Sequence, residues 1–423
     1  MAHHIAVVGG GWAGLAAAVR AVGLGHRVTL YEMAPQLGGR ARSLAGDGIT
    51  LDNGQHILIG AYTETLALMR MLGVDPAQVL LRAPLALRYP DGSGLALPGG
   101  PPMISFLRGV AACGGWPWPA RLALLREAAR WAARGFRCDA AWTVGRLCAR
   151  LPAAVRQDLI EPLCVAALNT PAAEASASVF LRVLRDALFS GPGSADLLLP
   201  RHGLDALLPE PAARWLALNH VEVRLGRRAG ALQARPGGWR LDGEAFDAVL
   251  LACSAAEAAR LAAPIAPDWS TQAAALDYEP IITLYLRCPG ARLPLPMMAL
   301  REGPDAPAQF VFDLGAIGGA AGVFALVVSG ARDWVRAGLD ATGRAALAQV
   351  VAAFPAGTWP TAPTLLRVLA EKRATFRCTP GLRRPPAAIA PGLVAAGDYI
   401  EGPYPATLEG AVRSGRLAAD LLV

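Results

Sequence analysis

A glycine-rich turn near the start of the chain constrains its fold most. Residues 4–8 are apolar, as in the central strand of a parallel sheet. The next segment, GGGWAGL, has the G-x-G-x-x-G spacing at Gly9, Gly11 and Gly14. Such glycines permit a tight turn, let a pyrophosphate approach the backbone and let a helix pack close to a strand. Residues 15–24 are rich in helix formers, so free amides at the helix start would face the phosphates.

An acidic residue follows the second predicted strand at the expected distance. Residues 27–31 predict that strand, and Glu32 ends it. An acid at this place bonds the ribose hydroxyls and disfavours a 2′-phosphate, so NADP is not expected. Together these features favour a dinucleotide site over an unliganded glycine turn. The predicted contacts within the turn are Gly9, Gly11, Trp12, Ala13 and Gly14.

A second glycine pair narrows the cofactor to FAD. Gly38, Gly39, Arg40 and Arg42 combine flexible backbone with fixed cations beside a pyrophosphate. This continuation resembles the FAD-binding amine oxidase and phytoene desaturase superfamily, whereas an NAD dehydrogenase does not need it. The resemblance implies an α/β fold, with a Rossmann-like FAD-binding domain of the GR2 type and an inserted α+β substrate domain.

The C-terminal segment agrees with this resemblance. Residues 393–396 predict a strand, Gly397 and Asp398 follow it, and a helix comes next. In the superfamily the glycine–aspartate pair holds the ribityl-phosphate region, and the helix start faces the flavin pyrimidine, here near Thr407 and Leu408. Amides at a helix start stabilise negative charge on a reduced flavin.

A third piece of the cofactor domain is expected in the middle of the chain. Residues 220–254 predict several short strands, and the resemblance implies that the backbone near Ala229 contacts the adenine. The cofactor domain is therefore expected to be discontinuous. The expected ranges are 1–83, 201–260 and 369–423 for FAD binding, and 84–200 and 261–368 for the substrate domain.

Three further stretches are more specific. They are DNGQHILIGAY at 52–62, PLCVAALNTP at 162–171 and EKRATF at 371–376. In this order they resemble the hydroxysqualene dehydroxylase family of bacterial hopanoid pathways, from about residue 4 to the C-terminus. The resemblance implies that hydroxysqualene loses its hydroxyl and that reduced FAD gives a hydride to the allylic cation. It also implies a long apolar isoprenoid substrate, and enzymes that make presqualene diphosphate and hydroxysqualene as functional neighbours.

The same resemblance places the DNGQH stretch close to the isoalloxazine ring. Asn53, Gly54 and Gln55 are expected to contact the cofactor. A general acid must protonate the leaving oxygen. The candidates for it are Asp52, His56, Tyr278 and Lys372. Imidazole titrates near the working pH, but a histidine here could also merely order the flavin loop.

Composition excludes several classes of protein. A hydrophobic fraction of 54% with 17% charged residues indicates a globular chain rather than a disordered one. Seven scattered cysteines without a CxxC pair predict reduced thiols in the cytoplasm and no metal site. Neither a secretory signal nor a transmembrane helix is expected, since glycines interrupt the apolar run 314–331. The net charge of +7 is nearly all arginine, which indicates coding bias rather than a nucleic-acid partner.

One basic segment predicts contact with a membrane. Trp116 and Trp118 precede a helix with arginines at 126, 130 and 134. Aromatic residues beside an arginine stripe suit a helix lying on an anionic membrane, although a solvated basic face is the alternative. Because the implied substrate partitions into lipid, we expect a cytoplasmic protein with peripheral contact to the inner membrane.

Three other functions remain open at this stage. A carotenoid-type desaturase would use the same scaffold but would leave FAD reduced, so the direction of electron flow separates it from a dehydroxylase. An amine oxidase is less favoured because no second aromatic cage is apparent. A non-catalytic lipid carrier would hold FAD structurally. The sequence also lacks a second G-x-G-x-x-G for NADPH, so the electron donor stays open.

Overall fold

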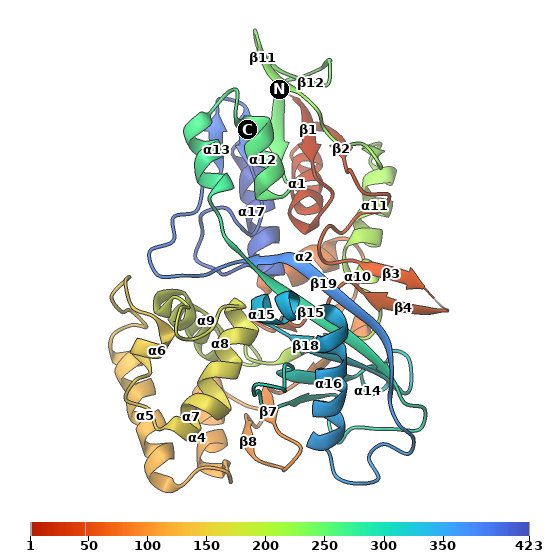
Figure 1. The fold of residues 1–423 in the computed structure, drawn as a ribbon. Coiled ribbons are helices and arrows are strands. Elements are labelled where there is room, and N and C mark those ends of the chain that lie inside the picture. Colours follow the sequence, from red (N-terminus) through yellow and green to blue (C-terminus); the bar gives the residue numbers. More distant parts are fainter. Residues whose placement is uncertain (1, 47, 423) are drawn as a thin grey trace.

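Two sheets organise the chain in the computed structural model, which describes residues 2–46 and 48–422 (Figure 1). The first sheet has the strand order β10-β2-β1-β14-β21-β20. Its strands pair in parallel except β20, which pairs antiparallel with β21. The strands are β1 (His4–Val8), β2 (Arg27–Tyr31), β10 (Glu222–Arg224), β14 (Ala248–Leu251), β20 (Ala388–Ala390) and β21 (Leu393–Ala395). The strands predicted at the two ends of the chain are confirmed.

Helices α1 (Trp12–Gly23) and α17 (Leu408–Asp420) lie side by side beside this sheet (Figure 1). Their backbones approach closely at Gly415, where an added Cβ would lie 2.1 Å from the Ala13 carbonyl oxygen. Only glycine fits there. The two ends of the chain, more than 380 residues apart, thus share one packed layer. Other helices of this region are α2 (Thr63–Met71), α3 (Pro76–Val79), α10 (Leu204–Leu207), α11 (Pro209–Leu218), α12 (Ala255–Ala262) and α13 (Pro267–Ala274).

The second sheet is antiparallel, with the order β16-β17-β18-β15-β19. Its strands are β15 (Tyr278–Arg287), β16 (Met297–Ala299), β17 (Phe310–Asp313), β18 (Val323–Val328) and β19 (Thr364–Phe376). The run DYEPIITLYLR at 277–287 predicts a strand, and β15 confirms it. The long pair β15 and β19 runs from the lower part of the molecule up to the first sheet (Figure 1). Residues 369–376, which we assigned to the FAD domain, thus form part of the second sheet.

A group of helices stands beside the second sheet, at the lower left of Figure 1. It comprises α4 (Pro102–Ala112), α5 (Trp118–Ala133), α6 (Val144–Leu147), α7 (Ala153–Val155), a π-helical turn (Arg156–Ile160), α8 (Glu161–Leu168) and α9 (Ala177–Phe189). Asn169 ends α8 in the left-handed conformation with φ +46°, two residues before Pro171.

Small elements join these parts. The strands are β3 (Ser43–Gly46), β4 (Ile49–Asp52), β5 (Leu58–Ile59), β6 (Leu80–Ala83), β7 (Ala86–Arg88), β8 (Gly94–Ala96), β9 (Leu197–Pro200), β11 (Leu232–Arg235), β12 (Gly238–Leu241) and β13 (Glu244–Phe246). The helices are α14 (Leu314–Ile317), α15 (Arg332–Ala337) and α16 (Leu339–Ala353). The apolar run 314–331 contains α14 and the buried strand β18. Within the described residues, none of the helices has the length and apolar character needed to span a membrane.

Candidate active site

The glycine turn between β1 and α1 is packed too tightly for any side chain. A Cβ added at Gly14 would lie 1.8 Å from the Gly9 carbonyl oxygen, and one at Gly9 would lie 2.5 Å from the Ala252 oxygen. Gly9 also has φ +113°. At Gly11 the nearest atom to an added Cβ is the Gly39 Cα, at 3.8 Å. The turn is therefore closed toward the sheet and leaves room above Gly11.

The start of α1 offers free backbone amides above this turn. Gly11 is its N-cap and supplies no side-chain hydrogen bond, and the first turn carries no acidic residue. The first amides of a helix lack partners within the helix, and they attract phosphate. Trp12 and Ala13 are buried, and the Trp12 indole donates to the Ala41 carbonyl oxygen at 2.9 Å. Trp12 therefore ties the second glycine motif to α1.

Glu32 is buried at the end of β2 and holds the turn in shape. Its two carboxylate oxygens accept the amides of Gly10 and Ala34, each at 2.7 Å. Each oxygen keeps a further lone pair, so the ribose contact predicted from the sequence remains compatible with this bracing. The segment leading to Ala229 runs alongside, because the Arg227 amide donates to the Glu32 carbonyl oxygen. The Ala229 carbonyl itself accepts from Arg260 at 2.5 Å.

The second glycine motif meets the C-terminal motif through an ion pair. The Arg40 guanidinium lies 2.5 Å from Asp398, which is 8% exposed, and it also donates to the Ala374 carbonyl oxygen of β19. Gly38 pairs with Gly11 in an isolated parallel bridge, and Gly39 adopts φ +63°. Arg42 folds back onto the Gly39 carbonyl oxygen at 2.9 Å. Residues 38–40 thus bridge the first turn, the 397–398 segment and β19.

The start of α17 forms another part of the candidate cofactor site. Thr407 caps this helix by accepting the Gly410 amide at 3.0 Å, and Leu408 begins it. Glu409 points away toward α2, where it accepts the amides of Glu64 and Thr65. Gly397 donates its amide to Ser414 of the same helix at 3.0 Å.

An unpaired polar atom lies beside these motifs. The Tyr399 side chain is 2% exposed, yet its hydroxyl has no hydrogen-bond partner in the described part of the chain. Burying a hydroxyl without a partner costs free energy, so such an atom points to a missing ligand. Its ring lies against Gly397, where an added Cβ would be 2.6 Å away. The glycine turn, the free helix start, the Arg40 cation and this hydroxyl together fit FAD. Sequence reasoning missed Tyr399.

The DNGQH stretch lies between this site and β15. Tyr285 of β15 donates its hydroxyl to the Asp52 carbonyl oxygen at 2.9 Å. An added Cβ at Gly54 would lie 3.5 Å from the His56 ring and 3.7 Å from the Thr283 hydroxyl. Thr283 and Tyr285 lie two residues apart on β15, so their side chains point to the same face of the sheet. Sequence reasoning missed both residues, because only the strand pairing places them beneath the loop.

Asp52 lines a cavity of about 420 Å³ at this junction. Further lining residues are Ile49, Leu51, Gln55, Arg201, His202, Tyr285 and Leu314. Its Oδ1 accepts from the Ser43 hydroxyl at 2.8 Å and from the Leu204 amide at 2.9 Å. Polar and apolar side chains line the cavity in comparable measure.

The four candidate acids differ in protonation. Burial raises the pKa of Asp52 to about 6 and that of Tyr278 to about 12. Burial lowers the pKa of His56, the nearby Arg40 charge lowers it further, and a hydrogen bond to the Gly54 carbonyl oxygen opposes this. His56 is therefore a neutral imidazole at neutral pH. Lys372 is exposed on β19, two residues before the carbonyl that binds Arg40.

The cofactor contacts predicted beside these acids hold the loop together. Asn53 donates its side-chain amide to the Arg40 carbonyl oxygen at 3.2 Å and its backbone amide to the Arg42 oxygen. Gln55 faces the cavity instead.

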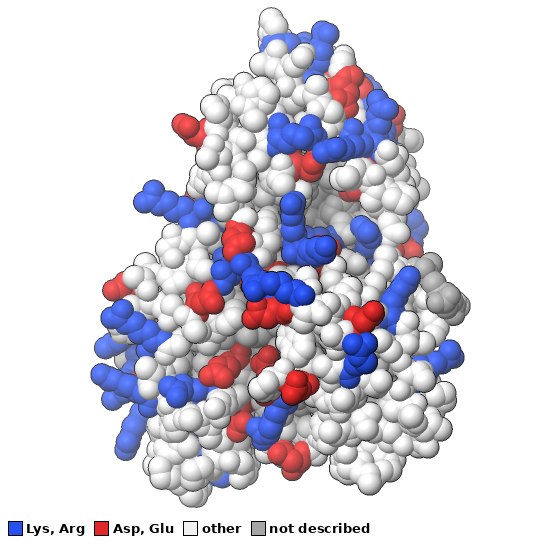
Figure 2. Space-filling model, in the orientation of Figure 1, with Lys and Arg blue, Asp and Glu red and all other residues white. Residues whose placement is uncertain are grey.

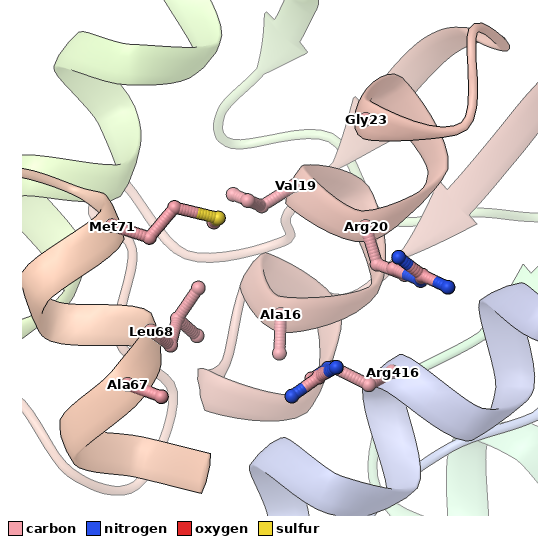
Figure 3. Close-up of a pocket in the computed structure, with 8 residues that line it drawn as sticks. All are labelled: Ala16, Val19, Arg20, Gly23, Ala67, Leu68, Met71 and Arg416. Carbon is pink, nitrogen blue, oxygen red and sulfur yellow. The ribbon is translucent and has the colours of Figure 1, made fainter.

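A smaller pocket of about 130 Å³ lies elsewhere, between α1, α2 and α17 (Figure 3). In Figure 3 Met71 extends toward Val19, and the guanidinium groups of Arg20 and Arg416 stand on the opposite side. None of its lining residues is a predicted cofactor contact. It therefore does not belong to the candidate site.

Proteins with similar sequences support this interpretation of the site. A hydroxysqualene dehydroxylase of Rhodopseudomonas palustris is 29% identical, covering 100% of this chain and 99% of the relative. Another, from Sinorhizobium fredii, is 27% identical over 100% and 98%. A zeta-carotene desaturase of Synechocystis sp. is 41% identical, but over only 16% of this chain and 14% of the relative. The resemblance inferred from the sequence motifs is thus confirmed, and the full-length similarity favours dehydroxylases over desaturases.

The fold is shared with solved oxidoreductase structures. An oxidoreductase from Methanosarcina mazei superposes with a TM-score of 0.73 at 16% identity, covering 97% of this chain and 98% of that one. The family model described as flavin containing amine oxidoreductase matches residues 12–423. The predicted α/β fold, the FAD cofactor and the enzyme class are confirmed. The chain belongs to the flavin-containing amine oxidoreductase family, as an FAD-dependent oxidoreductase.

Proposed function

We propose that this enzyme converts hydroxysqualene to squalene by reductive dehydroxylation. The observation that carries the proposal is the full-length similarity to relatives named hydroxysqualene dehydroxylase. In the overall reaction the C–O bond breaks, the protonated hydroxyl group leaves as water, and the carbon cation gains a hydride. When bound in its reduced form, FAD would supply this hydride, that is, two electrons and one proton. One proton must be delivered to the leaving oxygen, and the chain has to provide it.

Asp52 is the group best placed to hold that proton. Its carboxyl lines the cavity, and burial keeps its pKa at about 6, so a protonated fraction persists near neutral pH. A general acid is most effective when its pKa lies near the working pH. The Ser43 hydroxyl and the Leu204 amide fix one oxygen of the carboxyl. The other oxygen is left for the substrate.

We assign the remaining residues to positioning the substrate. Ile49, Leu51 and Leu314 give the cavity apolar walls, which suit the carbon chain beside an allylic alcohol. Tyr285 fixes the Asp52 backbone from the opposite sheet. His56, being neutral, serves to order the loop through its bond to the Gly54 carbonyl oxygen.

The proposal extends to the surroundings of the enzyme. The substrate class is a long apolar isoprenoid, and the functional neighbours are the enzymes that make presqualene diphosphate and hydroxysqualene. Because such molecules reside in lipid, we place the enzyme in the cytoplasm, at the surface of the inner membrane.

An anaerobic assay tests the reaction. The bound flavin is reduced, hydroxysqualene is added, and flavin absorbance and squalene are followed together. Reoxidation with squalene formed supports the proposal. Bleaching of the oxidised enzyme by a polyene precursor, without turnover of hydroxysqualene, would instead show a desaturase.

A pair of variants tests the proton donor. Asp52→Asn should lower the rate about 10²- to 10⁴-fold, the usual contribution of a general acid. Asp205→Asn is the matched control, because Asp205 joins the same network through the Ser43 amide but does not line the cavity. Equal losses in both variants would assign Asp52 a structural role only.

A further inference from the structure

Exposed apolar side chains gather on one part of the molecule. Of the fifteen large hydrophobic residues that are exposed among the described residues, five fall between positions 103 and 122. They are Met103, Ile104, Leu107, Trp118 and Leu122. The first three lie on α4 at positions i, i+1 and i+4, which form one helix face. The other two lie one turn apart at the start of α5.

One arginine ties the end of α4 to the start of α5. Arg121 of α5 donates to the Ala111 carbonyl oxygen near the end of α4, and its guanidinium stacks 4.7 Å from the centre of the Trp118 ring. Trp118 is 61% exposed. Trp116 is not part of this surface, contrary to our expectation. It is 2% exposed and donates its indole N–H to Asp158 at 3.2 Å, so it belongs to the core.

The charge around the apolar residues has one sign. Residues 102–134 contain five arginines and a single acid, Glu127. Glu127 is 8% exposed and pairs with Arg130, so it offers no negative charge to a partner. Figure 2 shows basic side chains gathered at the lower left, where Figure 1 places α5 and α6. The five arginines of residues 102–134 are Arg108, Arg121, Arg126, Arg130 and Arg134.

We propose that the α4–α5 surface, made of Met103, Ile104, Leu107, Trp118 and Leu122 with its arginine rim, docks on a bilayer of anionic lipid. The apolar side chains enter the interface, and the arginines bind lipid phosphates. Both features are required for an amphipathic element to bind a membrane. The proposal refines the proposed function, since it names the part of the chain that reaches the lipid holding the substrate.

Charge argues for lipid rather than for a second copy of the chain as the occupant. Two copies that met through this surface would bring two arginine rims together, and like charges repel. An anionic bilayer neutralises them. The aromatic residue agrees, because tryptophan favours the membrane–water interface.

Vesicle co-sedimentation of the full-length, FAD-loaded protein tests the proposal. The vesicles are phosphatidylcholine alone, or phosphatidylcholine mixed with phosphatidylglycerol. We expect binding to the mixed vesicles that weakens with salt. The double variant I104E/L107E should bind at least about tenfold more weakly. The double variant R126Q/R134Q should lose at least about fivefold on mixed vesicles only. L218E is the matched control, since Leu218 is 80% exposed on α11, and it should bind normally.

Three outcomes would overturn the proposal. The first is no vesicle binding at all, and the second is binding that I104E/L107E leaves unchanged. The third is self-association in sedimentation that I104E/L107E abolishes without any vesicle binding, which would make the surface a contact between copies. Flavin absorbance shows that the variants fold. Turnover of hydroxysqualene in detergent is measured separately, so a failure of the proposed reaction is distinguishable from a failure of docking.

Discussion

The parts around the two sheets are specified in different ways. Around the first sheet, backbones meet at Gly9, Gly14 and Gly415, where no side chain fits. The second sheet is held instead by buried apolar side chains, such as those of β17 and β18. Steric contact between backbones tolerates no substitution, whereas apolar packing tolerates exchanges of similar volume. The first sheet therefore depends on glycine at fixed positions, whereas the buried positions of β17 and β18 need apolar side chains of suitable volume.

The largest expected effect follows from this contrast. Gly14→Ala should destabilise the protein by about 3 kcal/mol or more, because the new Cβ would lie 1.8 Å from a carbonyl oxygen and force the backbone apart. Loss of bound FAD should accompany the loss of stability. Thermal unfolding and flavin absorbance measure both.

The same helix supplies the control. Gly23 lies at the end of α1, and an added Cβ there meets nothing within 4 Å. Gly23→Ala should be neutral or stabilise by up to about 1 kcal/mol. Similar results for the two variants would contradict the steric account.

A second prediction concerns the joint between the helical group and the second sheet. Asn169 is 4% exposed and donates to the Glu279 carbonyl oxygen and the Thr375 hydroxyl, while it accepts the Gly330 amide. Asn169→Ala should cost about 2–4 kcal/mol, because buried partners are left unsatisfied. Denaturant unfolding measures the loss.

A glycine variant separates the two contributions of Asn169. Its φ of +46° favours asparagine or glycine over alanine. Asn169→Gly restores the backbone preference but not the hydrogen bonds, so it should recover only about 1 kcal/mol of the loss. Full recovery would show that the side-chain bonds contribute nothing.

These two regions also show what the sequence can predict. The strand–turn–helix start, Glu32 and the Gly397–Asp398 pair follow from local patterns, so their positions were predictable. The burial of Trp116 was not, because its partner Asp158 lies 42 residues away. The role of Asn169 was not predictable either, because its partners come from three distant segments. Tyr399 carried no motif, and only its burial without a partner distinguishes it.

Tyr399 provides the third prediction, which sharpens the account of the cofactor half. If its hydroxyl donates to FAD, Tyr399→Phe should raise the FAD dissociation constant about three- to tenfold, the value of one hydrogen bond. Flavin fluorescence titration of the apoprotein measures this. If the hydroxyl instead has no partner in the holoenzyme, Tyr399→Phe should bind FAD unchanged and unfold at a higher temperature, since it removes an unpaired buried group.

The smallest expected effect concerns Asp52, at the boundary of the two halves, and depends on pH. Folding raises the pKa of this carboxyl from an ordinary 3.8 to about 6, since burial disfavours the charge. The folded state thus binds the proton more tightly than the unfolded state does. Its contribution to stability is fully present below about pH 3.8 and is lost as the pH rises through about 6. Because the side chain is partly exposed, we expect this contribution to the free energy of unfolding to be only about 1 kcal/mol.

Asp52→Asn removes this titration while its side-chain oxygen still accepts from Ser43 and Leu204. The variant should therefore gain stability relative to the natural chain as the pH rises from 4 to 7. Above pH 7 the difference between the two proteins should change little. Unfolding in urea across this range measures the difference. A constant difference would mean that the carboxyl is not desolvated in the folded state. It would then be ionised at neutral pH, and another group would have to give the proton to the leaving hydroxyl. Among the other candidate acids, Tyr278 has a pKa of about 12 and so remains protonated.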